Sequence, residues 1–192
     1  GCNVAVVDES AAGAGFSGPM SAIQTVDALV TDRPNLALWL GFADCVPIVA
    51  YDPDRPAIGI AHAGWRGTLL EVSRCLIETM QAAFGSRPAA LRVAIGPSIG
   101  PCCYEVGPDV EAAFRDRWRA LSVPIFRHAG DHRYLNLWEA NRRSLLAAGV
   151  PAEQIALTNT CTACEVDDFF SHRAQRGQAG RFAVIVGLRK GG

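Results

Sequence analysis

A thiol and an imidazole stand at the ends of two neighbouring apolar runs of strand length. Asp44 and Cys45 directly precede the run Val46 to Tyr51, and His62 directly follows the run Ala57 to Ala61. If the two runs pair as a hairpin, Cys45 enters one strand at the edge of the sheet where His62 leaves the other. Such a pair can bind zinc or can serve as nucleophile and base. Alternatively, Cys45 is a small buried hydrophobe and His62 a strand-end histidine whose hydrogen bonds are satisfied.

The residues that follow His62 are suited to an anion. Gly64 and Gly67 allow the backbone to approach a ligand, and Arg66 carries a permanently charged, forked donor. We expect a helix to begin near Thr68, and its N-terminus would favour negative charge. These features predict a phosphate site. Alternatively, Arg66 is a surface cation at a helix start, where the helix dipole disfavours it.

The remaining cysteines give weaker signals. Cys161 and Cys164 form a lone C-x-x-C, which has little specificity for zinc without a second pair, so we expect structural thiols there. Cys102 and Cys103 are adjacent, and adjacent side chains on an extended chain point in opposite directions. The sequence therefore predicts that they are turn thiols that cannot easily serve one ion.

Two of the four histidines are spaced as if they shared a helix face. His128 and His132 are four residues apart, but Gly130 and Asp131 lie between them and are expected to break a helix. We therefore expect solvated loop histidines rather than a pair of metal ligands.

The elements that must position these residues mix strands and helices without strict alternation. Strands are expected at Val4 to Val7, Leu36 to Leu40, Val46 to Tyr51, Ala57 to Ala61, Leu91 to Ile95, Ile155 to Leu157 and Phe182 to Leu188. Helices are expected at Thr68 to Phe84, with Gly85 as C-cap, at Val110 to Trp118 and at Leu137 to Ala148. This pattern predicts an α/β sandwich with mixed sheets that contain antiparallel pairs. No dinucleotide or P-loop glycine motif is present.

Composition narrows the class of protein. The 192 residues, 49% of them apolar, predict one domain spanning 1–192, and 18 Lys+Arg against 19 Asp+Glu disfavour a nucleic-acid partner. The longest apolar stretch, Ala37 to Tyr51, contains Asp44 and Pro47 and is too short for a membrane helix. Seven scattered cysteines are typical of a reducing, cytoplasmic setting. Because the chain begins at Gly1 without an initiator Met, we expect that an N-terminal segment is missing.

Four motifs occur in the order of a known family. They are Phe42-Ala43-Asp44-Cys45-Val46-Pro47; Ala61-His62-Ala63-Gly64-Trp65-Arg66-Gly67; Gly96-Pro97-Ser98-Ile99-Gly100-Pro101 with Tyr104-Glu105-Val106-Gly107; and Phe169-Phe170-Ser171-His172-Arg173 with Gly180-Arg181. From Gly1 to about Leu188 the chain resembles the YfiH family. Its members are labelled laccase-domain or polyphenol-oxidase-like proteins and also purine nucleoside phosphorylases.

The resemblance implies a zinc site made by a His-Cys-His set. Cys45 and His62 match the cysteine and the second histidine of that set, and the first histidine would lie upstream of Gly1. Because catalytic zinc usually has three protein ligands, Cys45 and His62 alone should bind it weakly or not at all.

Roles are also expected for two residues outside the Cys45–His62 pair. Because it is adjacent to Cys45, Asp44 would orient His62 or accept a hydrogen bond from a ribose hydroxyl, or equally would cap the turn. The resemblance places the segment of Arg173 near the active site, so Arg173 would help to hold a substrate phosphate or ribose, or else forms a surface salt bridge. Phe42, Asn136 and Ala174 depart from the common family pattern, and each change weakens a polar contact.

The function that the resemblance favours is a zinc-dependent purine nucleoside phosphorylase acting on adenosine, inosine or methylthioadenosine, with adenosine deamination as a second reaction. Catalysis would use Cys45, His62 and Asp44, and phosphate would bind at Gly64, Arg66, Gly67 and Arg173. The partners would be a purine nucleoside and phosphate, and the chain would be a monomer or weak dimer.

Three other functions are considered. A cysteine hydrolase, deamidase or peptidoglycan-editing enzyme would use Cys45 as nucleophile and His62 as base. A copper polyphenol oxidase is nearly excluded, because four histidines and no H-x-H pair cannot hold the copper ions of a laccase, although stray copper at Cys45 and His62 would allow weak oxidation. The last alternative is a truncated domain without activity.

Overall fold

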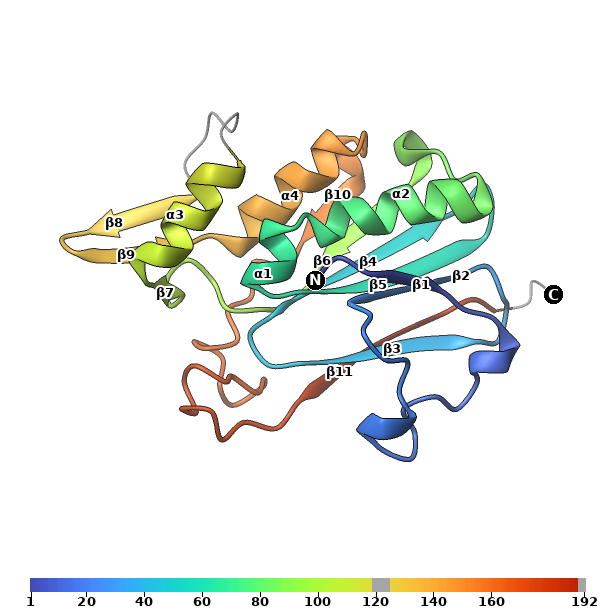
Figure 1. Ribbon diagram of the computed structural model, residues 1–192, viewed down its shortest axis with the longest axis horizontal. Helices are drawn as coiled ribbons and strands as arrows, with labels where there is room; N and C mark the ends of the chain where they lie inside the picture. Colours follow the sequence, from blue (N-terminus) through green and yellow to red (C-terminus); the bar gives the residue numbers. More distant parts are fainter. Residues whose placement is uncertain (119–124, 190–192) are drawn as a thin grey trace.

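A six-stranded mixed sheet forms the centre of the molecule. The computed structural model describes residues 1–118 and 125–189. The strand order in the central sheet is β1-β2-β5-β4-β6-β10 (Figure 1). The bounds are β1 Val4–Val6, β2 Ala28–Thr31, β4 Val46–Asp52, β5 Ala57–Ala63, β6 Arg92–Ile95 and β10 Ile155–Leu157. β1 runs parallel to β2 and β10 runs parallel to β6, whereas the other pairs are antiparallel.

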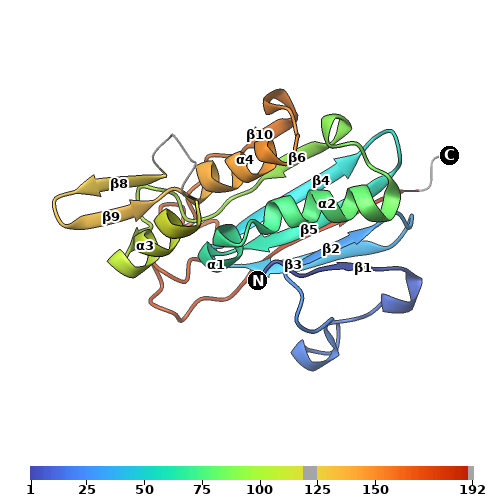
Figure 2. The same ribbon diagram turned by 45° about the horizontal axis from the view of Figure 1, so that its top comes forward.

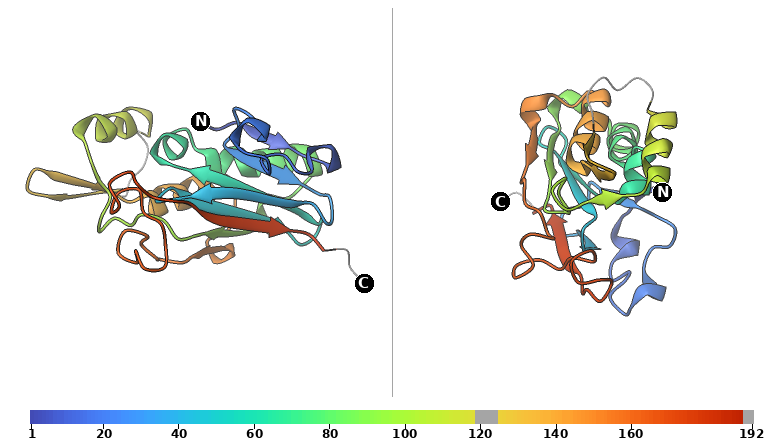
Figure 3. Two further views of the ribbon diagram at one scale, coloured as in Figure 1. Left: turned by 90° about the horizontal axis from the view of Figure 1, so that it is seen from below. Right: turned by 90° about the vertical axis from the view of Figure 1, so that its left-hand side faces the viewer.

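Helices cover one face of this sheet and a second sheet covers the other. The helices are α1 Trp65–Leu69, α2 Val72–Phe84 and α4 Leu137–Ala147. They lie above the sheet in Figure 1, with α2 along β5 in Figure 2. On the opposite side, β3 Ala37–Phe42 pairs antiparallel with β11 Phe182–Gly187 (Figure 3). The expected layered α/β sandwich with mixed sheets is confirmed.

The hairpin expected from the two central apolar runs is present. β4 and β5 pair antiparallel in the register Val46↔Ala63 and Pro47↔His62. Most residues of both strands are buried, and β5 lies between α2 on one face and β3 on the other. Gly59 permits the close approach of α2, since a Cβ there would lie 2.8 Å from a methyl group of Leu76.

A smaller subdomain projects from one end of the sheet. It contains β7 Glu105–Val106, α3 Pro108–Arg117, β8 Phe126–Ala129 and β9 His132–Leu135, and its strands have the order β7-β9-β8. His128 and His132 therefore lie on paired strands of a hairpin, which corrects the expectation of a loop. Gly130 does rule out a shared helix, because it has a φ of 58° and forms the turn between the two strands.

The helix expected over Thr68 to Phe84 is divided in two. α1 ends at Leu69 and α2 begins at Val72, because Glu71 adopts a left-handed conformation with φ 59°. The second helix ends as expected at Gly85, which has a φ of 68°. The start is earlier than expected: α1 begins at Trp65, directly after Gly64. β2 was not expected from the sequence, and it completes the sheet between β1 and β5.

Within residues 1–118 and 125–189, no helix combines the length and the apolar character required to span a bilayer.

Candidate active site

A pocket opens where β4 begins and β5 ends. Its volume is about 240 Å³. We call it the candidate pocket. It is lined by Gly1, Asp27, Asp44, Cys45, His62, Gly64, Trp65, Arg66, Gly67, Ile99, Tyr104 and Leu137. The structure therefore gathers six of the seven residues that the sequence singled out around one cavity, and the seventh, Arg173, lies nearby.

Cys45 and His62 are brought together by the register of the β4–β5 hairpin. Cys45 lies one position before Val46, whose partner is Ala63, so it faces the start of the segment after β5. Its Sγ lies 3.0 Å from the position that a Cβ of Gly64 would occupy. The His62 ring stacks on Phe42, with centroids 4.9 Å apart and planes inclined by 22°. The glycine leaves room for the sulfur, and the aromatic contact fixes the imidazole.

Burial keeps both side chains in their neutral forms. Burial, together with the charge of Asp44, raises the pKa of the Cys45 thiol to about 11. Burial also lowers the pKa of His62 below its ordinary value of 6.5. At neutral pH the pocket therefore holds a protonated thiol and an uncharged imidazole, which can accept a proton or bind a metal ion.

Asp44 is a buried carboxylate that ties the pocket to a distant segment. It is 7% exposed and has a φ of 82°. Its Oδ1 accepts a hydrogen bond of 2.7 Å from Thr162 Oγ1, and its Oδ2 accepts one of 2.6 Å from the backbone N–H of Arg173. These two contacts hold distant segments against Asp44, a role that was not expected from the sequence, and neither of them involves His62. Thr162 gave no signal in the sequence, because its partner lies 118 residues away.

Arg66 and its flanking glycines, Gly64 and Gly67, also line the pocket. Arg66 is exposed, and its guanidinium lies 4.2 Å from the centroid of the Trp65 ring. Gly67 lies close to Gly1: a Cβ on residue 67 would be only 3.2 Å from the Gly1 carbonyl oxygen. The helix behind these residues, α1, has only five residues. The expected support of a full helix N-terminus for phosphate is therefore weaker than the sequence suggested.

Arg173 lies beside the pocket and not among its lining residues. Its guanidinium donates a 2.8 Å hydrogen bond to the Glu105 carbonyl oxygen and lies 5.2 Å from the centroid of the Tyr104 ring. Arg173 therefore holds the Tyr104 segment in place.

Tyr104 is a pocket residue that the search for catalytic residues missed. Burial raises its pKa to about 12, so the phenol stays protonated and can donate a hydrogen bond into the pocket. The sequence did indicate Tyr104, because it belongs to one of the four motifs. What the sequence did not show is that Tyr104 lines the same pocket as Cys45.

The other cysteines are not scattered. The Sγ atoms of Cys102, Cys103, Cys161 and Cys164 all lie within 4.8 Å of one another. We call these four residues the cysteine cluster. Cys102 and Cys103 lie in a turn, as expected, but the turn brings both sulfurs into one group, so the expectation that their side chains point in opposite directions is wrong. Cys161 and Cys164 form a lone C-x-x-C in the sequence, as noted above, but in the structure the adjacent residues Cys102 and Cys103 supply two more sulfurs beside it.

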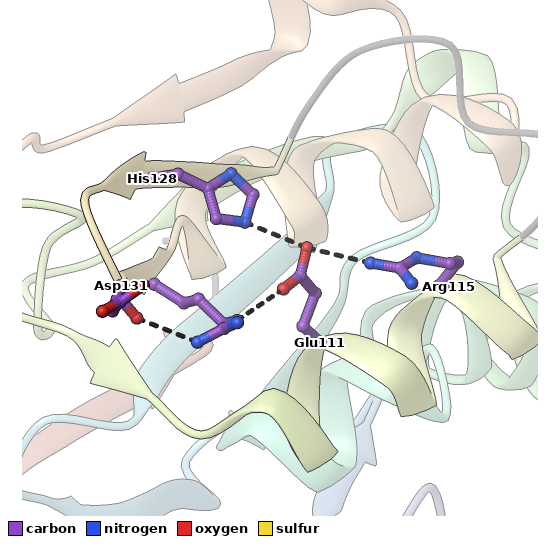
Figure 4. A network of polar contacts seen from close by, with 5 residues as sticks. Glu111, Arg115, His128 and Asp131 are labelled. Carbon is purple, nitrogen blue, oxygen red and sulfur yellow. Dashed lines mark hydrogen bonds and ion pairs between the residues drawn. The ribbon is translucent and has the colours of Figure 1, made fainter.

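The histidines of the β8–β9 hairpin pair with carboxylates. His128 Nε2 lies 3.1 Å from Glu111 Oε1, and Arg115 and Arg133 bind the same carboxylate at 3.2 and 3.0 Å (Figure 4). His132 Nδ1 lies 2.7 Å from Glu105 Oε1. Neither histidine belongs to a group of three or more possible metal ligands among the described residues.

Comparisons with known proteins agree with this fold. The family described as multi-copper polyphenol oxidoreductase laccase matches residues 1–189. The chain is 41% identical to "Purine nucleoside phosphorylase YlmD" of Geobacillus stearothermophilus over 99% of this chain and 70% of that protein. It is 37% identical to "Adenosine deaminase RL5" of an unknown prokaryotic organism over 94% of this chain and 69% of that protein.

A solved structure has the same fold. The crystal structure of YlmD from Geobacillus stearothermophilus superposes with a TM-score of 0.95 at 41% identity, over 99% of this chain and 71% of that chain. The chain thus spans about 70% of the length of these relatives, and less of others: 61% of the Bacillus subtilis purine nucleoside phosphorylase YlmD.

Proposed function

The chain belongs to the laccase-domain family, whose similar members include proteins named purine nucleoside phosphorylase; from this premise we propose that it is a purine nucleoside phosphorylase. Its substrates would be adenosine, inosine or methylthioadenosine together with phosphate. The observation that carries the proposal is the candidate pocket, where an imidazole, a thiol, a phenol and a guanidinium converge. A pocket of about 240 Å³ with an open mouth suits the reacting part of a nucleoside, the ribose and its phosphate, better than a whole substrate.

Phosphate would bind at the side of the pocket formed by Gly64, Arg66 and Gly67. Arg66 provides a forked, permanently charged donor, and its stacking on Trp65 restricts the guanidinium to one side of the pocket. The bound phosphate oxygen would attack C1′ of the ribose while the bond from C1′ to the purine nitrogen breaks. The new C1′–O bond gives ribose 1-phosphate, and the departing base takes the electron pair.

The leaving base requires a proton or a hydrogen bond. Tyr104 keeps its proton at neutral pH and is the donor that the pocket offers, whereas uncharged His62 is suited to accept a proton. Asp44 would act through position, because both of its oxygens already bind Thr162 and Arg173. Arg173 would likewise hold Tyr104 in place.

Zinc at Cys45 and His62 is part of the proposal only with a third ligand. A thiol and an imidazole are fitting donors for zinc, but within the described residues no third Cys, His, Asp or Glu joins them in a group of possible ligands. The donors present are therefore incomplete, and no step above depends on the ion. If bound there, zinc would supply a Lewis acid, which is what deamination of adenosine at C6 requires.

A cysteine hydrolase is the alternative use of the same pair. A nucleophilic cysteine needs a lowered pKa, and burial raises that of Cys45 to about 11. The charge of Arg181 acts in the opposite direction, but it lowers the pKa of the Cys45 thiol by less than burial and the charge of Asp44 raise it. We therefore favour the phosphorylase over the hydrolase, deamidase or peptidoglycan-editing function.

The test is a product assay with a matched pair of variants. The chain is incubated with adenosine, with and without phosphate, and the products are identified by mass. The proposal is supported if free adenine and ribose 1-phosphate form only when phosphate is present. Inosine as the sole product indicates deamination instead. The proposal is contradicted if no product depends on phosphate. Arg66→Ala should raise the KM for phosphate about tenfold, while Arg74→Ala, which removes a surface arginine paired with Glu78, should leave it unchanged.

A further inference from the structure

The cysteine cluster joins two segments that are far apart in sequence. Cys102 and Cys103 lie in the connection from β6 to β7, and Cys161 and Cys164 lie in the connection from β10 to β11. The two connections meet through a parallel bridge between Ser98 and Cys161. On each side of this bridge a turn presents two sulfurs to the other segment.

The backbone of both turns is built to hold these sulfurs. The Cys103 N–H donates to the Gly100 carbonyl at 3.0 Å, and the Cys164 N–H donates to the Cys161 carbonyl at 3.0 Å. Each bond closes a tight turn, which aims the two cysteines of that turn toward one point. This replaces the opposed directions that adjacent residues have on a strand.

The spacing of the sulfurs matches a metal site and not a pair of disulfides. Cys164 Sγ lies 3.7 Å from Cys102 Sγ and 3.5 Å from Cys103 Sγ. Sulfurs at about 2.3 Å from a zinc ion in a tetrahedron lie about 3.8 Å from each other. A disulfide would bring two of them to about 2.05 Å.

Second contacts around the sulfurs have the character of a ligand environment. Cys161 Sγ accepts a hydrogen bond of 3.2 Å from the Gly100 N–H, the kind of outer contact that supports a metal-bound thiolate. A Cβ on Gly100 would lie 2.7 Å from the Trp138 ring and 3.2 Å from Cys102 Sγ, so only glycine fits at this position. Cys102 and Cys164 are exposed, so burial of apolar thiols does not account for the gathering.

We propose that Cys102, Cys103, Cys161 and Cys164 bind one zinc ion as a structural site, separate from Cys45 and His62. All four positions of the tetrahedron are filled by sulfur, so no position is left for water or substrate. Each thiol loses its proton to solvent when it binds the ion. The proposal does not rest on the phosphorylase function.

The site would stabilise the candidate pocket from outside. Thr162 lies between the two cysteines of the C-x-x-C and donates to Asp44, and Tyr104 directly follows Cys103 and lines the pocket. A zinc ion that fixes both turns would therefore fix the residues on which the pocket depends.

Cobalt is the probe for the test. The full chain is purified under reducing conditions, freed of metal with a chelator, and titrated with Co²⁺ and then Zn²⁺. We expect one Co²⁺ per chain with thiolate charge-transfer and tetrahedral absorption bands, displaced by an equal amount of Zn²⁺. The bands should persist in the Cys45→Ser/His62→Ala variant and in the control Cys75→Ser, and should be lost in Cys161→Ser/Cys164→Ser.

A second measurement uses the unaltered chain, so it does not depend on whether a variant folds. Iodoacetamide labelling followed by peptide mass analysis should show that Zn²⁺ protects the four cluster cysteines and leaves the extent of labelling at Cys75 unchanged. The proposal is overturned if the cobalt bands survive in Cys161→Ser/Cys164→Ser or if zinc gives no protection. It is also overturned if the purified chain holds iron at the cluster, or if a disulfide joins the two turns even after purification under reducing conditions.

Discussion

The candidate pocket and the cysteine cluster both lie where separate segments meet, but they differ in how many donors they bring to one point. The pocket offers one thiol and one imidazole beside a cavity of about 240 Å³. The cluster places four sulfurs within 4.8 Å of one another. Few donors around open space are typical of sites that bind and convert a substrate, whereas a complete set of ligands is typical of a structural ion. The difference predicts that changes in the pocket reduce activity and changes in the cluster reduce stability.

The two regions are connected through one buried contact. Thr162, which lies within the cluster segment, donates a hydrogen bond to Asp44, which lines the pocket. Damage to the cluster should therefore reach the pocket, while damage to the pocket should leave the cluster intact. The predictions that follow test this asymmetry.

The largest expected effect is on activity. His62→Ala should lower kcat/KM about a thousandfold, because it removes the uncharged imidazole that would accept the proton released when phosphate forms the new C1′–O bond. The melting temperature should change little, since His62 lies at the end of a strand beside a cavity. Steady-state kinetics and thermal unfolding of the same preparation check both statements. Cys75→Ser is the control. If His62→Ala keeps its activity but unfolds more easily, the distinction between the two regions is lost.

The second effect is on stability. At free zinc about a thousand times its Kd, binding at the cluster should stabilise the folded chain by about 4 kcal/mol. For a chain of this size a strong chelator should then lower the melting temperature by roughly 10 °C. The same shift is expected in Cys45→Ser/His62→Ala and none in Cys161→Ser/Cys164→Ser. A shift that disappears with the pocket variant would assign the stabilising ion to the pocket.

The pocket could be predicted from the sequence because its two donors belong to neighbouring strands. Cys45 and His62 are joined by a hairpin, and the pairing of Val46 with Ala63 follows from two adjacent apolar runs. The cluster could not be predicted in this way. Cys103 and Cys164 are 61 residues apart, and their approach depends on the bridge between Ser98 and Cys161, which has no local signal.

The same reasoning explains the smaller errors. The three- and four-residue spacing of apolar residues located the helical segment before Gly85, but the same spacing runs on through Glu71, where the left-handed φ of 59° separates α1 from α2. The rule that adjacent side chains diverge is correct for strands and failed at Cys102 and Cys103, where the chain turns. Distant contacts such as that of Thr162 with Asp44 depend on the completed fold.

The third effect tests whether the cluster turn requires glycine. Gly100→Ala should destabilise the chain by about 1–3 kcal/mol, because the new methyl group would contact the Trp138 ring and Cys102 Sγ. It should also weaken Co²⁺ binding. Gly187→Ala is the matched control, since a Cβ there would have no neighbour nearer than 3.8 Å. Denaturant unfolding measures both, and equal losses of stability would show that Gly100 has no special role.

The smallest expected effect concerns the charge of His62. Burial lowers the pKa of His62 in the folded chain below its ordinary value of 6.5, so near and below that value the unfolded chain binds more protons than the folded one. The contribution of His62 to stability is therefore complete above pH 6.5 and decreases as the pH falls through the unfolded pKa. The slope from one group cannot exceed about 1.4 kcal/mol per pH unit.

In His62→Gln, which cannot be charged, this part of the slope should vanish between pH 7 and 5. In the control His132→Gln, whose histidine side chain is 62% exposed, it should remain. Equal slopes in all three proteins would mean that the imidazole is hydrated in the folded chain, and the pocket would then lack the neutral base that distinguishes it from the cluster.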